Sequence, residues 1–173
     1  MKLYLLRHAI AAERDPEKYP DDGQRPLTEA GRNKMVKIAG AFYKMGLQVD
    51  LILSSPLVRA RQTAEIARKY LHLKKDQLIL TETLAPAFDP VKLIAGIQAK
   101  YKVNALLLVG HEPDLSSLIS LLLSGDPSLL ITMKKAGICC LSMETLVAGK
   151  CAALEWLINP GLRIFLKDDG MIS

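Results

Sequence analysis

The sequence predicts an α/β fold, in which a mainly parallel β-sheet is flanked by helices on both faces and antiparallel edge strands follow near the C-terminus. Short continuous apolar runs alternate with amphipathic segments of helical period, and such runs are typical of parallel strands that are buried on both faces. The length of 173 residues suits one domain with its own core, so we expect a single domain over residues 1–173.

The parallel strands are predicted from four apolar runs, at residues 3–6, 51–53, 78–80 and 105–109. After each run comes a segment in which apolar residues recur every three or four positions, which is the pattern of an amphipathic helix. These helices are expected at residues 35–45, 57–71, 91–101 and 115–122. Two later runs, at residues 138–143 and 152–158, predict strands joined by a short turn near Gly149, and hence an antiparallel pair at the edge of the sheet.

A long polar segment separates the first predicted strand from the first predicted helix. Residues 9–26 are rich in proline, aspartate and glycine, and they exceed the usual length of a connection inside a compact domain. Loops of this length are commonly either functional or disordered. We therefore interpret residues 9–26 as a loop of one of these two kinds.

The composition excludes several classes of protein. Apolar residues make up 50% and charged residues 24% of the chain, which is a globular balance. No apolar run approaches the roughly 18–20 residues of a membrane helix, and the run at residues 3–6 is too short for the core of a signal peptide. Aromatic residues are few and no basic helix carries interleaved aromatics, so we expect neither a membrane nor a nucleic acid as a partner. The net charge of +5 suits an anionic substrate.

The three cysteines, Cys139, Cys140 and Cys151, are too few and too odd in number for a disulfide framework. Their spacing does not match that of a zinc site. We interpret them as reduced thiols of the core, and reduced thiols indicate a cytoplasmic protein.

Polar side chains follow the predicted strands at one edge of the sheet. In an open α/β sheet, ligands bind beyond the carboxyl ends of the strands. Arg7 and His8 follow the first strand and His111 follows the fourth, so two of the three histidines are expected at the same edge. The third histidine, His72, follows a helix in a lysine-rich stretch and is expected at the surface.

The second strand leads into a helix start that suits an anion. Ser55 has the residue type of an N-cap and Pro56 that of a first helical residue, so free backbone N–H groups are expected there. Arg59 lies in the first turn of this helix, and its planar guanidinium matches phosphate oxygens. Arg61 lies two residues further on and is expected to face outward in an ion pair. Together with the two histidines, these residues predict a phosphate site.

These residues fall within motifs that resemble the histidine phosphatase superfamily, and above all its short SixA-type phosphohistidine phosphatases. The motifs follow one another in the order seen in that superfamily, from the first strand to just past His111. They are Leu6-Arg7-His8-Ala9, Arg25-Pro26-Leu27-Thr28, Ser54-Ser55-Pro56-Leu57-Val58-Arg59-Ala60-Arg61-Gln62-Thr63-Ala64 and Val109-Gly110-His111-Glu112-Pro113. The resemblance implies a phosphoglycerate mutase-like fold.

The resemblance also implies roles for individual residues. It makes His8 the nucleophile, which takes the phosphoryl group and then loses it to water, while Arg7 and Arg59 bind the phosphoryl oxygens. His111 completes the pocket, and Arg25 matches a further phosphate-binding arginine of SixA-like members. No metal or other cofactor is implied, because the arginines supply the positive charge.

The motifs do not identify a general acid. The carboxylates near the predicted edge are Glu82, Asp89, Glu112 and Asp114, and each is better interpreted as a helix-start or solvated residue. A phosphohistidine substrate needs less help from an acid, because an imidazole leaves phosphorus more easily than an alkoxide does. We therefore expect a phosphorylated protein that carries phosphohistidine as the substrate. A small phosphate ester is the alternative, and a non-catalytic phosphate-binding signalling module is the second alternative.

Overall fold

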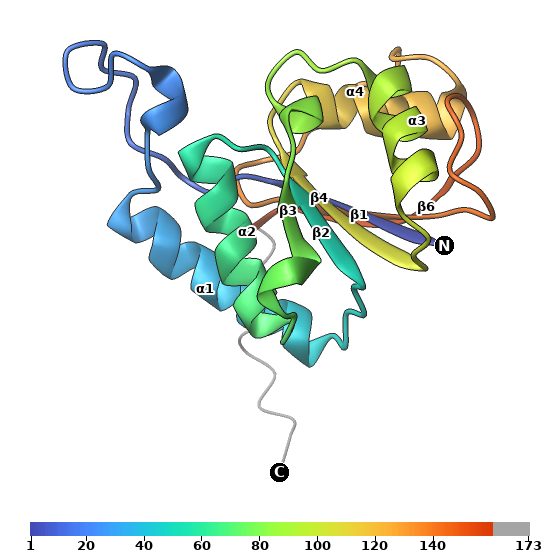
Figure 1. Ribbon diagram of the computed structural model, residues 1–173, viewed down its shortest axis with the longest axis horizontal. Coiled ribbons are helices and arrows are strands. Elements are labelled where there is room, and N and C mark those ends of the chain that lie inside the picture. The colour runs from blue at the N-terminus through green and yellow to red at the C-terminus, as the bar shows by residue number, and fades with distance from the viewer. Residues whose placement is uncertain (161–173) are drawn as a thin grey trace.

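The computed structural model describes residues 1–160 and contains one six-stranded sheet. Its strands are β1 (Lys2–Arg7), β2 (Leu51–Ser54), β3 (Leu78–Leu80), β4 (Ala105–Gly110), β5 (Ile138–Ser142) and β6 (Ala153–Ile158). Their order across the sheet is β3-β2-β4-β1-β5-β6 (Figure 1). The pairs among β1 to β4 are parallel, whereas β5 pairs antiparallel with β1 and with β6. The predicted α/β class is therefore confirmed, including the antiparallel strands near the C-terminus.

Helices cover both faces of this sheet. Within residues 1–160 the α-helices are α1 (Glu29–Lys44), α2 (Val58–Tyr70), α3 (Pro90–Lys100) and α4 (Asp114–Ser124). The short 3-10 turns are η1 (Asp22–Gln24), η2 (Lys75–Gln77) and η3 (Glu82–Leu84). Helices α1 and α2 pack on one face, and α3 and α4 pack on the other (Figure 1). This is the arrangement that the alternation of apolar runs and amphipathic segments predicts.

The apolar runs are continuous because each strand has a core on both sides. In β1, Leu3 and Leu5 pack against α3 and α4, whereas Tyr4 and Leu6 pack against α1 and α2. All four side chains are buried. Successive side chains of a strand point to opposite faces, so a strand inside a two-sided core needs an apolar residue at every position.

The helix starts follow from local side-chain chemistry, with one difference from the prediction. Thr28 caps α1, because its hydroxyl oxygen accepts a hydrogen bond from a backbone N–H group of the first turn. The prediction that Ser55 caps α2 is wrong, and Pro56 is not helical. Helix α2 begins at Val58, and Leu57 at the N-cap position makes no side-chain hydrogen bond. Ser55 lies in the turn before the helix, where its hydroxyl contacts a histidine instead.

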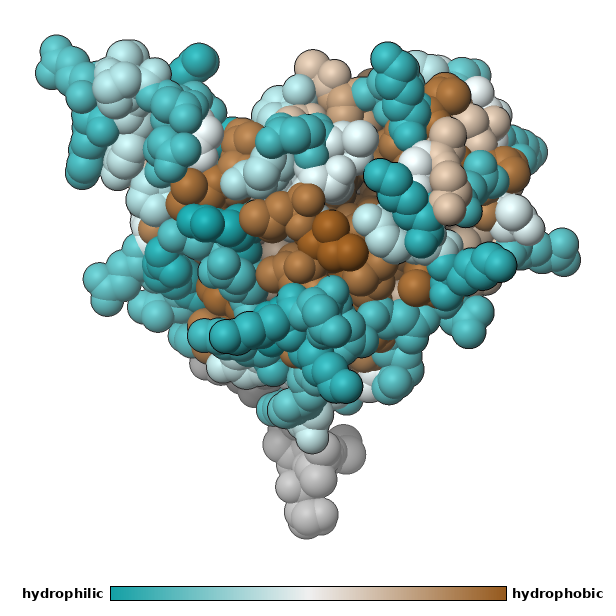
Figure 2. Space-filling view, in the orientation of Figure 1, coloured by the Kyte–Doolittle hydropathy of each residue, from teal (hydrophilic) through white to brown (hydrophobic). Residues whose placement is uncertain are grey.

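Residues 9–26, called here the 9–26 loop, stand away from the sheet on the side of α1 and α2 (Figure 1). An isolated bridge between Ala11 and Leu27 closes the base of this loop. Residues 13–18 beyond the bridge are exposed, and Figure 2 shows this part as a mostly hydrophilic lobe. The turn η1 lies at the inner end of the loop and contacts α2. The loop thus returns to the body of the protein at η1.

The C-terminal edge of the sheet is formed by β6, while β5 lies inside the sheet between β1 and β6. The connection between β5 and β6 is longer than the predicted short turn, since it spans residues 143–152. Gly149 lies within it and has a φ of 126°, which favours glycine. Within residues 1–160, no helix combines the length and the apolar character needed to cross a membrane.

Gly31 lies where α1 passes close to the 9–26 loop, and replacing it by alanine is expected to destabilise the protein. An added Cβ would lie only 2.0 Å from the carbonyl oxygen of Ile10. Relief requires a backbone shift, so we expect a loss of about 2 kcal/mol or more in the free energy of unfolding. The matched control is Gly96→Ala in α3, where the added Cβ would meet no atom within 4 Å apart from the adjoining residues and backbone of its own helix. That change should raise stability by about 0.5–1 kcal/mol. Equal melting temperatures for the two variants would contradict the close approach.

Candidate active site

Two buried histidines meet at the carboxyl ends of neighbouring strands. Arg7 of β1 is paired with Gly110 of β4, and His8 and His111 are the next residues along these strands. The centroids of the two imidazole rings are 5.1 Å apart, and the ring planes are inclined by 55°. The exposed fractions are 8% for His8 and 3% for His111, so both rings are almost fully removed from water. The structure therefore brings the two histidines together at the edge where the sequence predicts them.

The His8 ring is held in one tautomer. Its Nδ1 lies 2.8 Å from the carbonyl oxygen of Ala9. A carbonyl oxygen can only accept a hydrogen bond, so Nδ1 carries the proton and Nε2 keeps its lone pair. The pKa of His8 is lowered to about 4, mainly by burial. The hydrogen bond to Ala9 raises this pKa, whereas the charges of Arg59 and Arg7 lower it further. The ring is therefore neutral near pH 7.

His111 is fixed by the serine that the sequence assigns to a helix cap. Its Nε2 lies 2.8 Å from Ser55 Oγ, and Ser55 Oγ also accepts a hydrogen bond of 3.3 Å from the N–H group of Leu57. Burial lowers the pKa of His111 to about 3, and the neighbouring His8 and Arg59 add to the effect. Its Nδ1 is buried and has no partner among residues 1–160. Ser55 therefore lies in the site, but next to His111 and not at the start of α2.

Two arginines approach the histidines from different elements. Arg7, at the end of β1, donates from Nη1 to the carbonyl oxygen of Met133 at 2.7 Å. Arg59, at the second position of α2, is 5% exposed and donates from Nη1 to the carbonyl oxygen of Asp22 at 2.8 Å. The Nε atoms of both arginines are buried without a partner among the described residues. Buried donors of this kind normally have an acceptor, so these N–H groups are suited to a bound anion.

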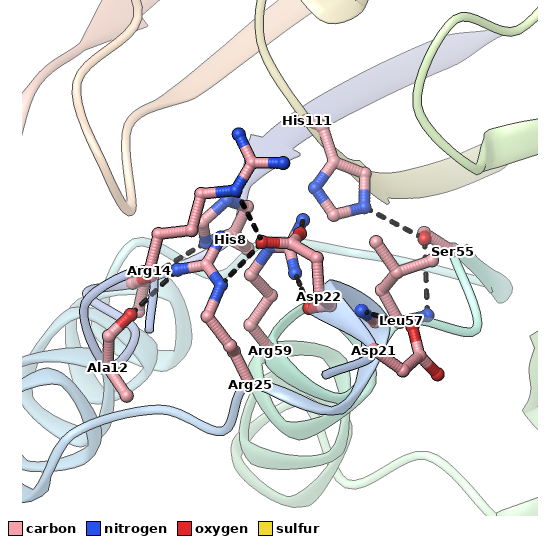
Figure 3. Close-up of polar contacts among 12 residues, drawn as sticks. His8, Ala12, Arg14, Asp21, Asp22, Arg25, Ser55, Leu57, Arg59 and His111 are labelled. Carbon is pink, nitrogen blue, oxygen red and sulfur yellow. Dashed lines mark hydrogen bonds and ion pairs between the residues drawn. The ribbon is translucent and has the colours of Figure 1, made fainter. Parts of the chain in front are cut away.

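Asp22 joins three arginines around one carboxylate (Figure 3). Its Oδ1 lies 2.7 Å from Arg25 Nε and 3.8 Å from Arg14 Nε, and its Oδ2 lies 3.1 Å from Arg59 Nη2. Arg25 also donates from Nη1 to the carbonyl oxygen of Ala12 at 2.7 Å. The hydrogen bond from Arg25 and the charges of Arg59 and the other arginines hold the pKa of Asp22 below its usual value. The carboxylate is therefore ionised near pH 7.

Sequence reasoning missed Asp22 and Arg14, and it also missed Thr63. The hydroxyl of Thr63 accepts from the N–H group of Ala9 at 3.0 Å and donates to the carbonyl oxygen of Arg59 at 2.7 Å. It thereby ties the chain just after His8 to the helix that carries Arg59. Thr63 falls within the third motif, so its place there was the only available signal. Asp22 and Arg14 lie outside all four motifs.

The four carboxylates near the predicted edge have other contacts. Asp89 caps α3, and Asp114 Oδ2 accepts from the N–H group of Ala87 at 2.8 Å. Glu112 accepts hydrogen bonds from both the N–H and the hydroxyl group of Ser116. Glu82 lies exposed in η3. In the part of the chain that the structure describes, none of the four forms an ion pair or hydrogen bond with the histidines or arginines of the site.

The remaining polar residues are separate from the site. Arg61 faces outward and lies 3.9 Å from Glu65, as an outward ion-pairing residue of α2 should. His72 is exposed, and its ring packs edge-on against Tyr43. Within residues 1–160, no three His, Cys, Asp or Glu side chains come together as a group that could hold a metal ion.

The chain is similar to known proteins, and their family agrees with the geometry of the histidine and arginine site. Residues 3–85 match the family described as the histidine phosphatase superfamily (branch 1). An uncharacterised protein of Picosynechococcus sp. is 37% identical over 140 residues, which cover 80% of this chain and 82% of that protein. The chain belongs to the histidine phosphatase superfamily. It is therefore a phosphatase, a hydrolase that acts on phosphorylated substrates.

Within the superfamily the chain is similar to SixA proteins. It is 27% identical to the phosphohistidine phosphatase SixA of Escherichia coli over 163 residues, which cover 92% of this chain and 94% of that protein. A structure of the protein histidine phosphatase SixA complexed with tungstate superposes with a TM-score of 0.79 at 24% identity, and the match covers 94% of this chain and 99% of that one. The similarity to the tungstate complex concerns the fold, and it confirms the expected phosphoglycerate mutase-like architecture.

Proposed function

We propose that this histidine phosphatase acts through a phosphohistidine intermediate on His8. The observation that carries the proposal is the state of the His8 ring. Its Nδ1 proton is bound to the Ala9 carbonyl and its pKa is about 4, so Nε2 offers a lone pair at neutral pH. Nε2 attacks phosphorus while the bond to the leaving group breaks. A water molecule then cleaves the phosphorus–nitrogen bond and releases inorganic phosphate.

The surrounding donors support this reaction. Arg7 and Arg59 bind the phosphoryl oxygens, and their unpartnered Nε–H groups are available for this contact. In this scheme the Ser55 hydroxyl, 2.8 Å from His111 Nε2, acts as the donor of that hydrogen bond, and the unpartnered Nδ1 of His111 carries the proton that is directed to the phosphoryl group. Arg25 adds a further positive charge from the 9–26 loop. Phosphoryl transfer depends mainly on position and on charge opposite the equatorial oxygens, and in this scheme the arginines supply that charge without a metal.

The substrate that we propose is phosphohistidine on a signalling or phosphotransfer protein. Within residues 1–160, the four edge carboxylates form no hydrogen bond or ion pair with the histidines or arginines of the site, and Asp22 is held ionised by its arginines. None of these carboxyl groups is therefore in place to protonate a leaving group. An imidazole leaving group tolerates this better than an alkoxide does. The similarity to SixA of Escherichia coli supports the same substrate class.

The proposed substrate is tested by comparing kcat/KM values in the presence of EDTA for a phosphohistidine-bearing phosphotransfer protein, phosphoserine and a sugar phosphate. We expect the phosphohistidine protein to be preferred by about 100-fold or more, a ratio within reach of ordinary substrate discrimination. A faster reaction with either ester would favour the small-ester alternative. Loss of all activity in EDTA would contradict the metal-free scheme. Binding of inorganic phosphate without turnover of any substrate would favour the second alternative, a non-catalytic phosphate-binding module.

A further inference from the structure

Asp22 is hydrogen-bonded to Arg59, one of the arginines that are expected to bind the substrate. Arg59 donates from Nη1 to the backbone oxygen of Asp22 at 2.8 Å, and its Nη2 lies 3.1 Å from the carboxylate of the same residue. Both terminal nitrogens of Arg59 are therefore bound to Asp22. These two N–H groups form the planar fork with which a guanidinium binds two oxygens of a phosphate. The Nε–H of Arg59 has no partner among residues 1–160, but a phosphoryl group that binds through the two terminal nitrogens, or through Nε and one of them, needs a nitrogen that Asp22 holds.

Arg25 is occupied in the same way. Its Nε lies 2.7 Å from the carboxylate of Asp22, and its Nη1 donates to the carbonyl oxygen of Ala12 at 2.7 Å. Each oxygen of this carboxylate faces one guanidinium nitrogen, Arg25 Nε at Oδ1 and Arg59 Nη2 at Oδ2, as the oxygens of a bound oxyanion would (Figure 3). A dianion that entered beside this carboxylate would be repelled by it, because two negative charges at contact distance oppose each other. The arrangement therefore opposes phosphate binding as long as Asp22 stays in place.

Apart from its contacts with the arginines, little packing holds Asp22 in this position. Its side chain is 37% exposed, whereas that of Arg59 is 6% exposed. The turn η1, which carries Asp22, contains no buried residue, so its movement uncovers no part of the apolar core. The turn belongs to the 9–26 loop, whose base is closed separately by the bridge between Ala11 and Leu27. The inner part of the loop can thus move while the base stays attached.

We propose that Asp22 is an internal competitor for the phosphoryl site, which holds Arg25 and Arg59 while the site is empty and leaves when the phosphoryl group enters. The proposal rests on the phosphoryl site described under Proposed function. The competition lowers the affinity for every oxyanion by the same factor, including the product, inorganic phosphate. A phosphorylated protein has further surface with which to bind, whereas free phosphate has none. Asp22 would therefore limit inhibition by the product and favour substrates that are larger than their phosphoryl group.

The test is the affinity for inorganic phosphate, measured by calorimetry on the wild type and on Asp22→Asn. Asparagine keeps the size of the side chain and removes its charge. We expect the variant to bind phosphate about tenfold more tightly, because charge-assisted hydrogen bonds no longer have to be broken. The matched control is Asp21→Asn, since Asp21 accepts hydrogen bonds from Gly23 and Gln24 and, within residues 1–160, forms no ion pair with an arginine. This control should bind phosphate as the wild type does.

Weaker or unchanged binding by a folded Asp22→Asn variant would overturn the proposal, and weaker binding would instead make Asp22 a residue that positions the arginines. A second measurement separates displacement from simple charge repulsion. Saturating phosphate should speed amide hydrogen exchange at residues 22–25 in the wild type, and slower exchange there would contradict displacement. Both measurements are independent of turnover, so they stand even if His8 is not the nucleophile.

Discussion

Replacing His8 by alanine is expected to lower kcat for an aryl phosphate about 10⁴-fold, which corresponds to about 5.4 kcal/mol in the activation free energy. The change removes His8 Nε2, the nitrogen whose lone pair makes the attack in the proposed reaction. His111 cannot replace it, because its Nε2 is already hydrogen-bonded to Ser55. Water would then have to attack the bound phosphoryl group directly. Affinity for inorganic phosphate should change far less than kcat, because Arg7 and Arg59 remain.

Two quantities are measured. The first is the initial rate of aryl phosphate hydrolysis in EDTA, and the second is the molecular mass of the enzyme, determined by mass spectrometry after the reaction is quenched during turnover. Wild-type protein should carry one added phosphoryl group on the peptide that contains His8, and the variant should carry none. His72→Ala is the matched control, since His72 is exposed and lies outside the site. It should retain the wild-type rate. A His8→Ala variant with more than about a tenth of the wild-type kcat would contradict the proposed intermediate.

Replacing Arg59 by lysine is expected to lower kcat/KM by about 10²–10³-fold, although the charge is kept. A lysine ammonium cannot present two parallel N–H groups to the phosphoryl oxygens. Arg59 also lies 6% exposed in its side chain, so a shorter and differently hydrated group would be poorly accommodated. Both the affinity and the stabilisation of the transition state should fall.

Arg61→Lys provides a control on the same helix. Arg61 faces outward and is paired only loosely with Glu65, at 3.9 Å, so its replacement should change kcat/KM by less than about twofold. Melting temperatures of both variants would show whether a loss of activity reflects unfolding. Similar losses of kcat/KM in the two variants would show that the position of Arg59 in the site carries no special role.

The sheet and the histidine pair could be predicted because their signals are local. Each parallel strand is a short apolar run, and the residue that follows a strand must lie at the edge of the sheet. His8 and His111 are therefore placed by the sequence without knowledge of long-range contacts. Arg59 is also placed in this way, because it follows the second strand within one helical turn.

The contacts of the 9–26 loop could not be predicted in the same way. Asp22 binds Arg59 across 37 residues of sequence, and no local periodicity relates two such positions. The error at Ser55 has a different cause. Serine has the correct residue type for an N-cap, but Leu57 adopts an extended conformation with a ψ of 135°, so the helix begins only after it. Residue type alone does not fix the position at which the backbone turns.

The pairing of Arg7 with Gly110 has a consequence for how such a phosphatase can evolve. The two histidines follow directly on paired residues of adjacent central strands, so a slip of one residue would displace them by about 3.3 Å and turn their side chains to the opposite face. The distance between the two histidines is therefore set by the register of β1 and β4. Arg14, Asp22 and Arg25 belong to a surface loop, where insertions and substitutions are tolerated. Descendants of this chain can therefore acquire new substrates through the loop while the two histidines keep their relative position.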